Sequence, residues 1–199
     1  MRILIRAAPA VALLAVQILV GPPPAAAEAP GVTHYVLDAA RSTLEFSFTQ
    51  EGAQNKGRFT RFAVTFDFSP ENLAASRLDV TVETNSLDTG DQERDDTLRG
   101  ADLFAVAKFP QAHFVATAVS QTAAGFEAVG KLTLRDVTRE VRVPFTFRTA
   151  TENGVAVGYM TGKTTLRRLD FGVGQGDWKA TDQVGNDVSV SFALRLTAR

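Results

Sequence analysis

The sequence contains no cysteine and only two histidines, and these shortages remove several classes of function. Without cysteine there is no disulfide, thiolate metal site, iron–sulfur cluster, thiol nucleophile or lipid-modified N-terminal cysteine. His34 and His113 are far apart in the sequence and no G-x-S-x-G motif is present, so the pattern favours neither a zinc site nor a Ser-His-Asp hydrolase. The glycine-rich segment 171–177 lacks the strand and helix that flank a nucleotide-binding loop, and is interpreted as a flexible turn. We therefore expect a protein that is not an enzyme, with no catalytic residues, metal site or cofactor.

The sequence also lacks an excess of either charge and any long apolar run after residue 20. A formal net charge of −1, with no run of basic residues, argues against nucleic acid as a partner. The apolar stretch 7–20 follows two arginines, is too short to span a bilayer, and precedes an A-x-A site at residues 25–27. This pattern predicts a secretory signal peptide at residues 1–27 and a mature domain at 28–199, and an interfacial helix is the alternative for the first segment. The absence of disulfides in an exported chain suggests a bacterial envelope compartment, and we expect the periplasm.

What the sequence has in quantity is phenylalanine, with fourteen Phe against one Trp and two Tyr. Apolar and polar residues alternate in eight segments: 43–49, 62–68, 77–84, 113–119, 126–134, 139–147, 157–166 and 187–196. Such alternation is typical of strands that are wet on one face and buried on the other. Short links such as Asn153-Gly154 predict an all-β fold, an eight-stranded antiparallel barrel, with a two-sheet sandwich as the alternative. Pro144 predicts a bulge or a barrel edge within its strand.

One segment breaks the alternation between the third and fourth predicted strands. Residues 86–110 contain Asp and Thr residues that could cap a helix, then acidic residues that favour the first turn. Gly100 is a plausible helix end and Pro110 a stop. The sequence therefore predicts a short helical insertion at one mouth of the barrel, either as a solvated cap or as a gate.

The interior of such a barrel is the candidate binding site. Eight strands enclose a space that is either just filled by side chains or holds one ligand. Strands of about 10 residues rise roughly 33 Å, or about 25 Å along the axis after a tilt of ~40°. A cavity of that shape suits an extended hydrocarbon, whereas a dry core packed by its own Phe side chains is the alternative.

An ordered series of motifs carries a resemblance to a known family. The segments are YVLDAARSTLEFSF (35–48), GRFTRFAVTFDF (57–68), NSLDTGDQERDDTLRGADLFAVAKFPQAHF (85–114), GKLTLRDVTREV (130–141), LRRLDFGVG (166–174) and GNDVSVSFAL (185–194). Over nearly all of residues 34–197 the chain resembles the YceI-like family, lipocalin-like polyisoprenoid-binding proteins of the bacterial periplasm. The resemblance implies an extended lipocalin-like barrel that holds an isoprenoid lipid, with a quinone tail or a polyprenyl phosphate as its ligand. Members of the family often carry His at the position of Thr97, so this sequence departs from the family pattern in the segment near the mouth.

Pattern and resemblance together assign a set of residues to the ligand. The predicted lining is Leu44, Phe46, Phe48, Phe62, Val64, Phe66, Val80, Val82, Phe114, Leu132, Leu134, Phe145 and Phe192, closed at one end by Leu98, Leu103, Phe104 and Phe109. Arg94, Arg99 and Arg168 are the candidates for a head group, because guanidinium groups match the oxygens of a pyrophosphate or quinone, and surface ion pairs are their alternative role.

Three functions follow from these assignments. We expect a periplasmic protein that binds, stores or transports an isoprenoid lipid, as a monomer or a homodimer. The alternatives are an accessory that delivers a quinone to a membrane redox protein such as a cytochrome, and a ligand-free structural or stress-related envelope protein.

Overall fold

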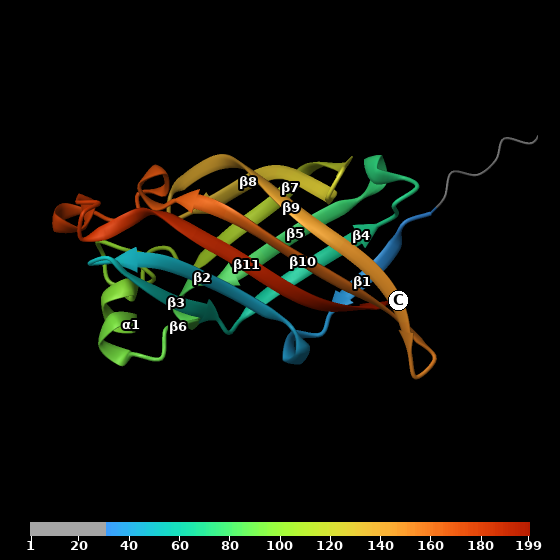
Figure 1. The fold of residues 1–199 in the computed structure, drawn as a ribbon, viewed down its shortest axis with the longest axis horizontal. Coiled ribbons are helices and arrows are strands. Elements are labelled where there is room, and N and C mark those ends of the chain that lie inside the picture. The colour runs from blue at the N-terminus through green and yellow to red at the C-terminus, as the bar shows by residue number, and fades with distance from the viewer. Residues whose placement is uncertain (1–30) are drawn as a thin grey trace, which may run out of the picture.

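The computed structural model describes residues 31–199, so the signal peptide predicted for residues 1–27 lies outside the described residues. Regular structure in the described part is almost entirely β (Figure 1). The strands are β1 (Thr33–Leu37), β2 (Thr43–Gln50), β3 (Ala53–Phe59), β4 (Phe62–Phe68), β5 (Arg77–Glu83), β6 (Leu87–Asp88), β7 (Gln111–Thr122), β8 (Gly125–Leu134), β9 (Val137–Glu152), β10 (Val155–Arg167) and β11 (Val184–Ala198). One α-helix, α1 (Gln92–Arg99), and several short 3-10 helices complete this part of the chain. No helix in residues 31–199 has the length and hydropathy needed to span a bilayer.

Eight strands form a closed antiparallel barrel, as the alternation predicted. The ring runs β1-β4-β5-β7-β8-β9-β10-β11, and it closes where β1 pairs with β11 through Tyr35–Ala198, Val36–Thr197 and Leu37–Leu196. The two-sheet alternative therefore does not apply. Figure 1 shows an elongated tube in which long strands cross at a tilt, with α1 near one end and the C-terminus near the other.

The identity of the closing strand differs from the prediction. Strand β1 was not predicted, because its five residues THYVL are too short and mixed to show alternation. It pairs with the end of β11, and β2 pairs with the same edge of β11 further along, through Thr43 to Gln50. Strand β2 then carries β3 and the two-residue β6. Strand β3, with the sequence AQNKGRF, was also missed, since it has almost no apolar residue to alternate.

The helical insertion is shorter than the segment 86–110 in which it was predicted. The side chain of Asp91 accepts a hydrogen bond from the backbone N–H of Arg94 (3.1 Å), and this cap begins α1. The helix ends before Gly100, whose N–H donates to the Thr97 carbonyl. After it, turns lead to Pro110 and β7. Because Arg94, Thr97 and Leu98 line the barrel cavity, α1 covers part of one mouth.

Pro144 marks a gap in the hydrogen-bonded wall. The ladder between β9 and β10 ends at the pair Phe145–Gly162, and Phe145 is the residue that directly follows the proline. Beyond it the Thr164 hydroxyl donates to the Arg142 carbonyl (2.9 Å), so a side chain replaces a backbone bond at this point. A proline has no N–H for the ladder, which is why the strand was expected to show an edge here.

The half of the barrel away from α1 is filled by aromatic rings. We call this cluster the aromatic plug, and it consists of Tyr35, Phe66, Phe68, Phe126, Phe145 and Phe147. Phe66 and Phe68 stack with ring centroids 5.0 Å apart, and Phe147 meets both rings at steep angles. Offset-stacked and edge-to-face arrangements are those that aromatic pairs prefer in cores. The plug therefore gives the barrel a dry core at one end only.

Candidate ligand-binding site

A cavity of about 460 Å³ occupies the barrel between the aromatic plug and α1. Every strand of the wall that reaches this half contributes alternate residues, as Leu44, Phe46 and Phe48 do on β2. On β11 the same alternation gives Val188, Val190, Phe192 and Leu194. The alternation that predicted the strands thus also places their apolar side chains on the cavity wall.

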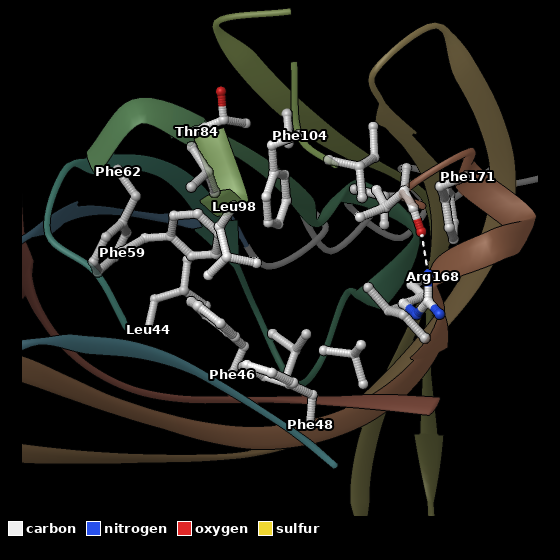
Figure 2. A pocket seen from close by; sticks show the side chains of 18 of the residues that line it. Leu44, Phe46, Phe48, Phe59, Phe62, Thr84, Leu98, Phe104, Arg168 and Phe171 are labelled. Carbon is white, nitrogen blue, oxygen red and sulfur yellow. Dashed lines mark hydrogen bonds between the residues drawn. The ribbon is translucent and has the colours of Figure 1, made fainter. Parts of the chain in front are cut away.

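Most of the residues that the sequence assigned to the ligand do face this cavity. They are Leu44, Phe46, Phe48, Phe62, Val64, Val80, Val82, Leu98, Leu103, Phe104, Phe114, Leu132, Leu134 and Phe192. Figure 2 shows Phe46, Phe48, Phe59, Leu98 and Phe104 gathered on one side of the space, with Phe171 and Arg168 on the other. The cavity therefore joins residues of the barrel wall to residues of the segment that contains α1.

Three of the assigned apolar residues lie elsewhere. Phe66 and Phe145 point into the barrel but belong to the aromatic plug, with 0% and 3% of their surface exposed. Phe109 lies beside the cavity region rather than in its wall, and its ring faces the Lys108 ammonium (5.0 Å) and the Arg135 guanidinium (5.5 Å). Alternation shows which face a side chain takes, but not how far along the barrel neighbouring rings fill the space.

The open end of the cavity carries most of the polar residues of its lining. Arg94, Asp91, Glu93 and Thr97 lie here, with Gln50 from the end of β2. The Arg94 guanidinium is 3.6 Å from the Asp91 carboxylate. The Thr97 hydroxyl donates to the Glu93 carbonyl (2.9 Å). A head group at this mouth would meet more negative than positive charge.

Arg99, assigned to the head group from sequence, does not line the cavity. Its guanidinium donates to the Leu87 carbonyl (2.8 Å) and lies 3.2 Å from Asp96 and 3.8 Å from Asp95. The Asp95 carboxylate in turn accepts the backbone N–H and the hydroxyl of Thr89. Arg99 therefore fastens α1 to β6 at the mouth.

Arg168 does line the cavity, yet its donors are all used within the protein. Its five N–H groups reach five backbone carbonyls, those of Val173, Trp178, Ala180, Val184 and Gly185, at 2.7 to 3.2 Å. Only 5% of the residue is exposed, and burial lowers the pKa of its guanidinium, which nevertheless stays charged as arginine does in proteins. Arg168 organises the segment 172–185 around itself.

Residues 171–177 were interpreted from sequence as a flexible turn before Trp178, and the structure adds that this turn lies against the cavity. Val173 of the turn and Trp178 directly after it belong to the cavity wall. Gly174 shows why glycine is needed there: its φ is +117°, and a Cβ would lie 2.0 Å from Arg168 Nη1. The turn is therefore built tightly against the arginine, and the glycine-rich motif serves this close approach.

Sequence reasoning missed other lining residues for two reasons. Phe59, on the polar strand β3, packs against Phe46 (5.2 Å between centroids) and Phe104 (6.1 Å), but no alternation marks it. Met160 and Leu166 lie on β10, whose weak pattern identified a strand without assigning its inner face. The described residues contain no group of three His, Asp or Glu side chains that could hold a metal ion.

Comparisons with known proteins agree with this architecture. The model of the YceI-like domain matches residues 35–196, which is most of the chain. The chain belongs to the YceI-like family. Among curated relatives, UPF0312 proteins of Yersinia pestis and Yersinia enterocolitica are each 45% identical over 85 residues. These matches span 43% of this chain and 44% of each relative, so the chain matches less than half the length of these proteins.

Several solved structures share the fold. BcnA of Burkholderia cenocepacia is 30% identical, with a TM-score of 0.73 over 80% of this chain and 98% of that one. The YceI protein of Campylobacter jejuni is 21% identical, with a TM-score of 0.66 over 74% of this chain and 86% of that one. A polyisoprenoid-binding domain from Saccharophagus degradans, implicated in plant cell wall breakdown, is 18% identical, with a TM-score of 0.60 over 83% of this chain and 98% of that one.

Proposed function

We propose that this YceI-like protein binds a lipid with an isoprenoid tail in the barrel cavity and carries or stores it in the periplasm. The observation that supports it most is a cavity of about 460 Å³ with almost wholly apolar walls. At about 24 cal/mol per Å³, an empty cavity of this size would cost roughly 11 kcal/mol, which is comparable to the whole stability of a domain. A space of this size inside a closed ladder is therefore better explained as a binding site than as a packing defect.

The shape and chemistry of the site favour a hydrocarbon chain. The cavity falls within the roughly 300–1,000 Å³ that small-molecule sites occupy, and most of its few polar groups lie at one end. A ligand with an apolar tail and one polar end fits this distribution. The solved domain from Saccharophagus degradans that shares the fold is named for polyisoprenoid binding, which supports the same class of ligand here.

The mouth favours an uncharged head group, such as a quinone, over a polyprenyl phosphate. Asp91 and Glu93 lie beside Arg94 at the opening, and Arg94 already faces Asp91. Arg99 and Arg168 use their N–H groups on backbone carbonyls and on acidic side chains of the protein. A phosphate would therefore meet two carboxylates without a dedicated cation, and like charges at short range disfavour binding.

Two matched ligands test this proposal. Farnesol and farnesyl phosphate carry the same tail, so a titration of the purified protein with each isolates the contribution of the head group. We expect farnesol to bind more tightly at neutral pH, with a difference that grows at low salt. Tighter binding of the phosphate would reassign the protein to polyprenyl phosphates, and failure of both ligands to bind would contradict the proposal.

Two tryptophan substitutions, one inside and one outside the barrel, test where the ligand binds. Val190 points into the cavity from β11, so Val190→Trp should take up part of the space and weaken binding. Lys163→Trp places the same side chain on the exposed outer face of β10, where binding should be unchanged. Equal loss of binding in both variants would show that the ligand does not occupy the barrel.

The periplasmic location rests on the predicted signal peptide. If residues 1–27 are removed on export, N-terminal sequencing of protein from a periplasmic extract should begin at Glu28. Recovery of the uncleaved chain from the cytoplasm alone would contradict this part of the proposal.

A further inference from the structure

The cavity ends inside the barrel at two phenylalanine rings. Along the inner face of β4, Phe62 and Val64 line the cavity and the next inner residue, Phe66, does not. Along β9, Val143 lines it and Phe145 does not. The rings of Phe66 and Phe145 meet edge to face across the barrel, with centroids 6.2 Å apart. These two side chains therefore form the aromatic part of the cavity floor, beside Met160 and Leu194, which still line the cavity.

The layers beneath this floor leave no continuation of the cavity. The Phe68 ring centroid lies 5.0 Å from those of Phe66, Phe126 and Phe147. The Phe66 and Phe147 centroids are 5.4 Å apart. Gly158 makes room for the plug, because a Cβ at this position would lie 2.6 Å from the Phe147 ring. A hydrocarbon chain could pass through the barrel only by displacing several packed rings.

We propose that the aromatic plug limits the length of the tail that this protein binds, so that the ligand is a short isoprenoid rather than a long one. This inference rests on the proposed function. A methylene group has about the volume of one water in the liquid, roughly 30 Å³. The cavity volume of about 460 Å³ therefore corresponds to on the order of 15 methylene groups. That number corresponds to a farnesyl tail. A longer tail would leave its remaining carbons outside the mouth, near Asp91 and Glu93.

A series of alcohols with increasing tail length tests the limit. Geraniol, farnesol and geranylgeraniol differ by one isoprene unit at each step, and Trp178, the single tryptophan, lines the cavity and gives a fluorescence signal for titration. Because each buried methylene adds roughly fourfold in affinity, farnesol should bind at least about tenfold more tightly than geraniol. Geranylgeraniol should bind no more tightly than farnesol.

Variants of the floor should move this limit. Phe145→Ala removes a ring close in size to one isoprene unit, so geranylgeraniol should now bind at least about tenfold more tightly than farnesol. Phe68→Ala is the matched control, since it truncates an equally buried ring below the intact floor and should keep the wild-type limit. If Phe145→Ala does not fold, Phe145→Leu offers a smaller opening, and a rise in the ratio of the two affinities is still expected.

The outcomes separate this inference from the proposed function. A continued tenfold gain from farnesol to geranylgeraniol in the wild-type protein would overturn the length limit alone. The same limit in the Phe145 and Phe68 variants would also overturn it, because the floor would then not set the length. Failure of all three alcohols to bind the wild-type protein would overturn the proposed function and the length limit together.

Discussion

Replacing Arg168 by methionine should open the segment 172–185 while the barrel stays folded. Methionine keeps much of the aliphatic length but removes all five hydrogen bonds to backbone carbonyls. The bonds to Val173 and Val184 are buried, so their carbonyls lose a partner without gaining water. At about 1–3 kcal/mol for each unsatisfied buried group, the cost is roughly 2–6 kcal/mol. The other three carbonyls are partly buried and can find water at lower cost.

Trp178 makes the local opening visible, because its own carbonyl is one of the five acceptors. Urea unfolding followed by tryptophan fluorescence should shift to lower urea in Arg168→Met, ahead of the transition followed by far-ultraviolet circular dichroism. Arg142→Met is the control, since Arg142 is largely exposed and forms one ion pair with Glu127 (2.8 Å), worth about 0–1 kcal/mol. Coincident and wild-type-like transitions in Arg168→Met would refute the role that we assign to the arginine.

Three further perturbations have defined outcomes. Phe46→Asp should lower the free energy of unfolding by several kcal/mol and reduce the yield of folded protein, because Phe46 is buried. Thr43→Asp, on the exposed start of β2, should leave the thermal midpoint nearly unchanged. Equal losses of stability in the two variants would contradict the register of β2. Asp91→Ala should cost about 1 kcal/mol in urea unfolding through loss of the N-cap of α1, and no change would mean that the cap is not needed. The hydrogen bond from the Tyr159 hydroxyl, and to a lesser extent the one from the Arg195 guanidinium, holds the pKa of Glu152 below its usual value. The Glu152 carboxylate therefore stabilises the fold at neutral pH, and this stabilisation is lost as the pH falls through the lowered pKa. Glu152→Gln should therefore reduce stability at pH 7 and flatten the loss of stability in acid, and a parallel pH profile would contradict this.

Alternation was sufficient to predict the long strands and, except in β10, the face that each buries, because a strand that is wet on one side must repeat with period two. It could not predict β1 or β3, which are short or polar and are held mainly by ladder bonds to β11, β4 and β2. Nor could it separate Val64, which lines the cavity, from Phe66, which lies in the aromatic plug two residues later.

The arginines show a second limit of sequence reasoning. Arg94, Arg99 and Arg168 look equivalent as residue types, but one faces the mouth, one fastens a helix and one organises a turn. These roles depend on contacts between segments that are distant in sequence. A guanidinium in a sequence shows only that a strong donor is available.

The pairing of β1 with β11 has a consequence for the kinetics of folding. Tyr35 pairs with Ala198, and the Arg199 N–H donates to the His34 carbonyl (2.9 Å), so the seam joins the two ends of the described chain. Contacts of such large sequence separation form slowly, because the entropy of closing the loop is lost before the contact contributes. During synthesis the ring stays open until the last strand is available, and until then the inner faces of the other strands are accessible from the side. If a hydrophobic ligand enters before β1 pairs with β11, the rate of ligand uptake depends on when this seam forms. The width of the mouth then does not limit the rate at which the ligand enters the barrel.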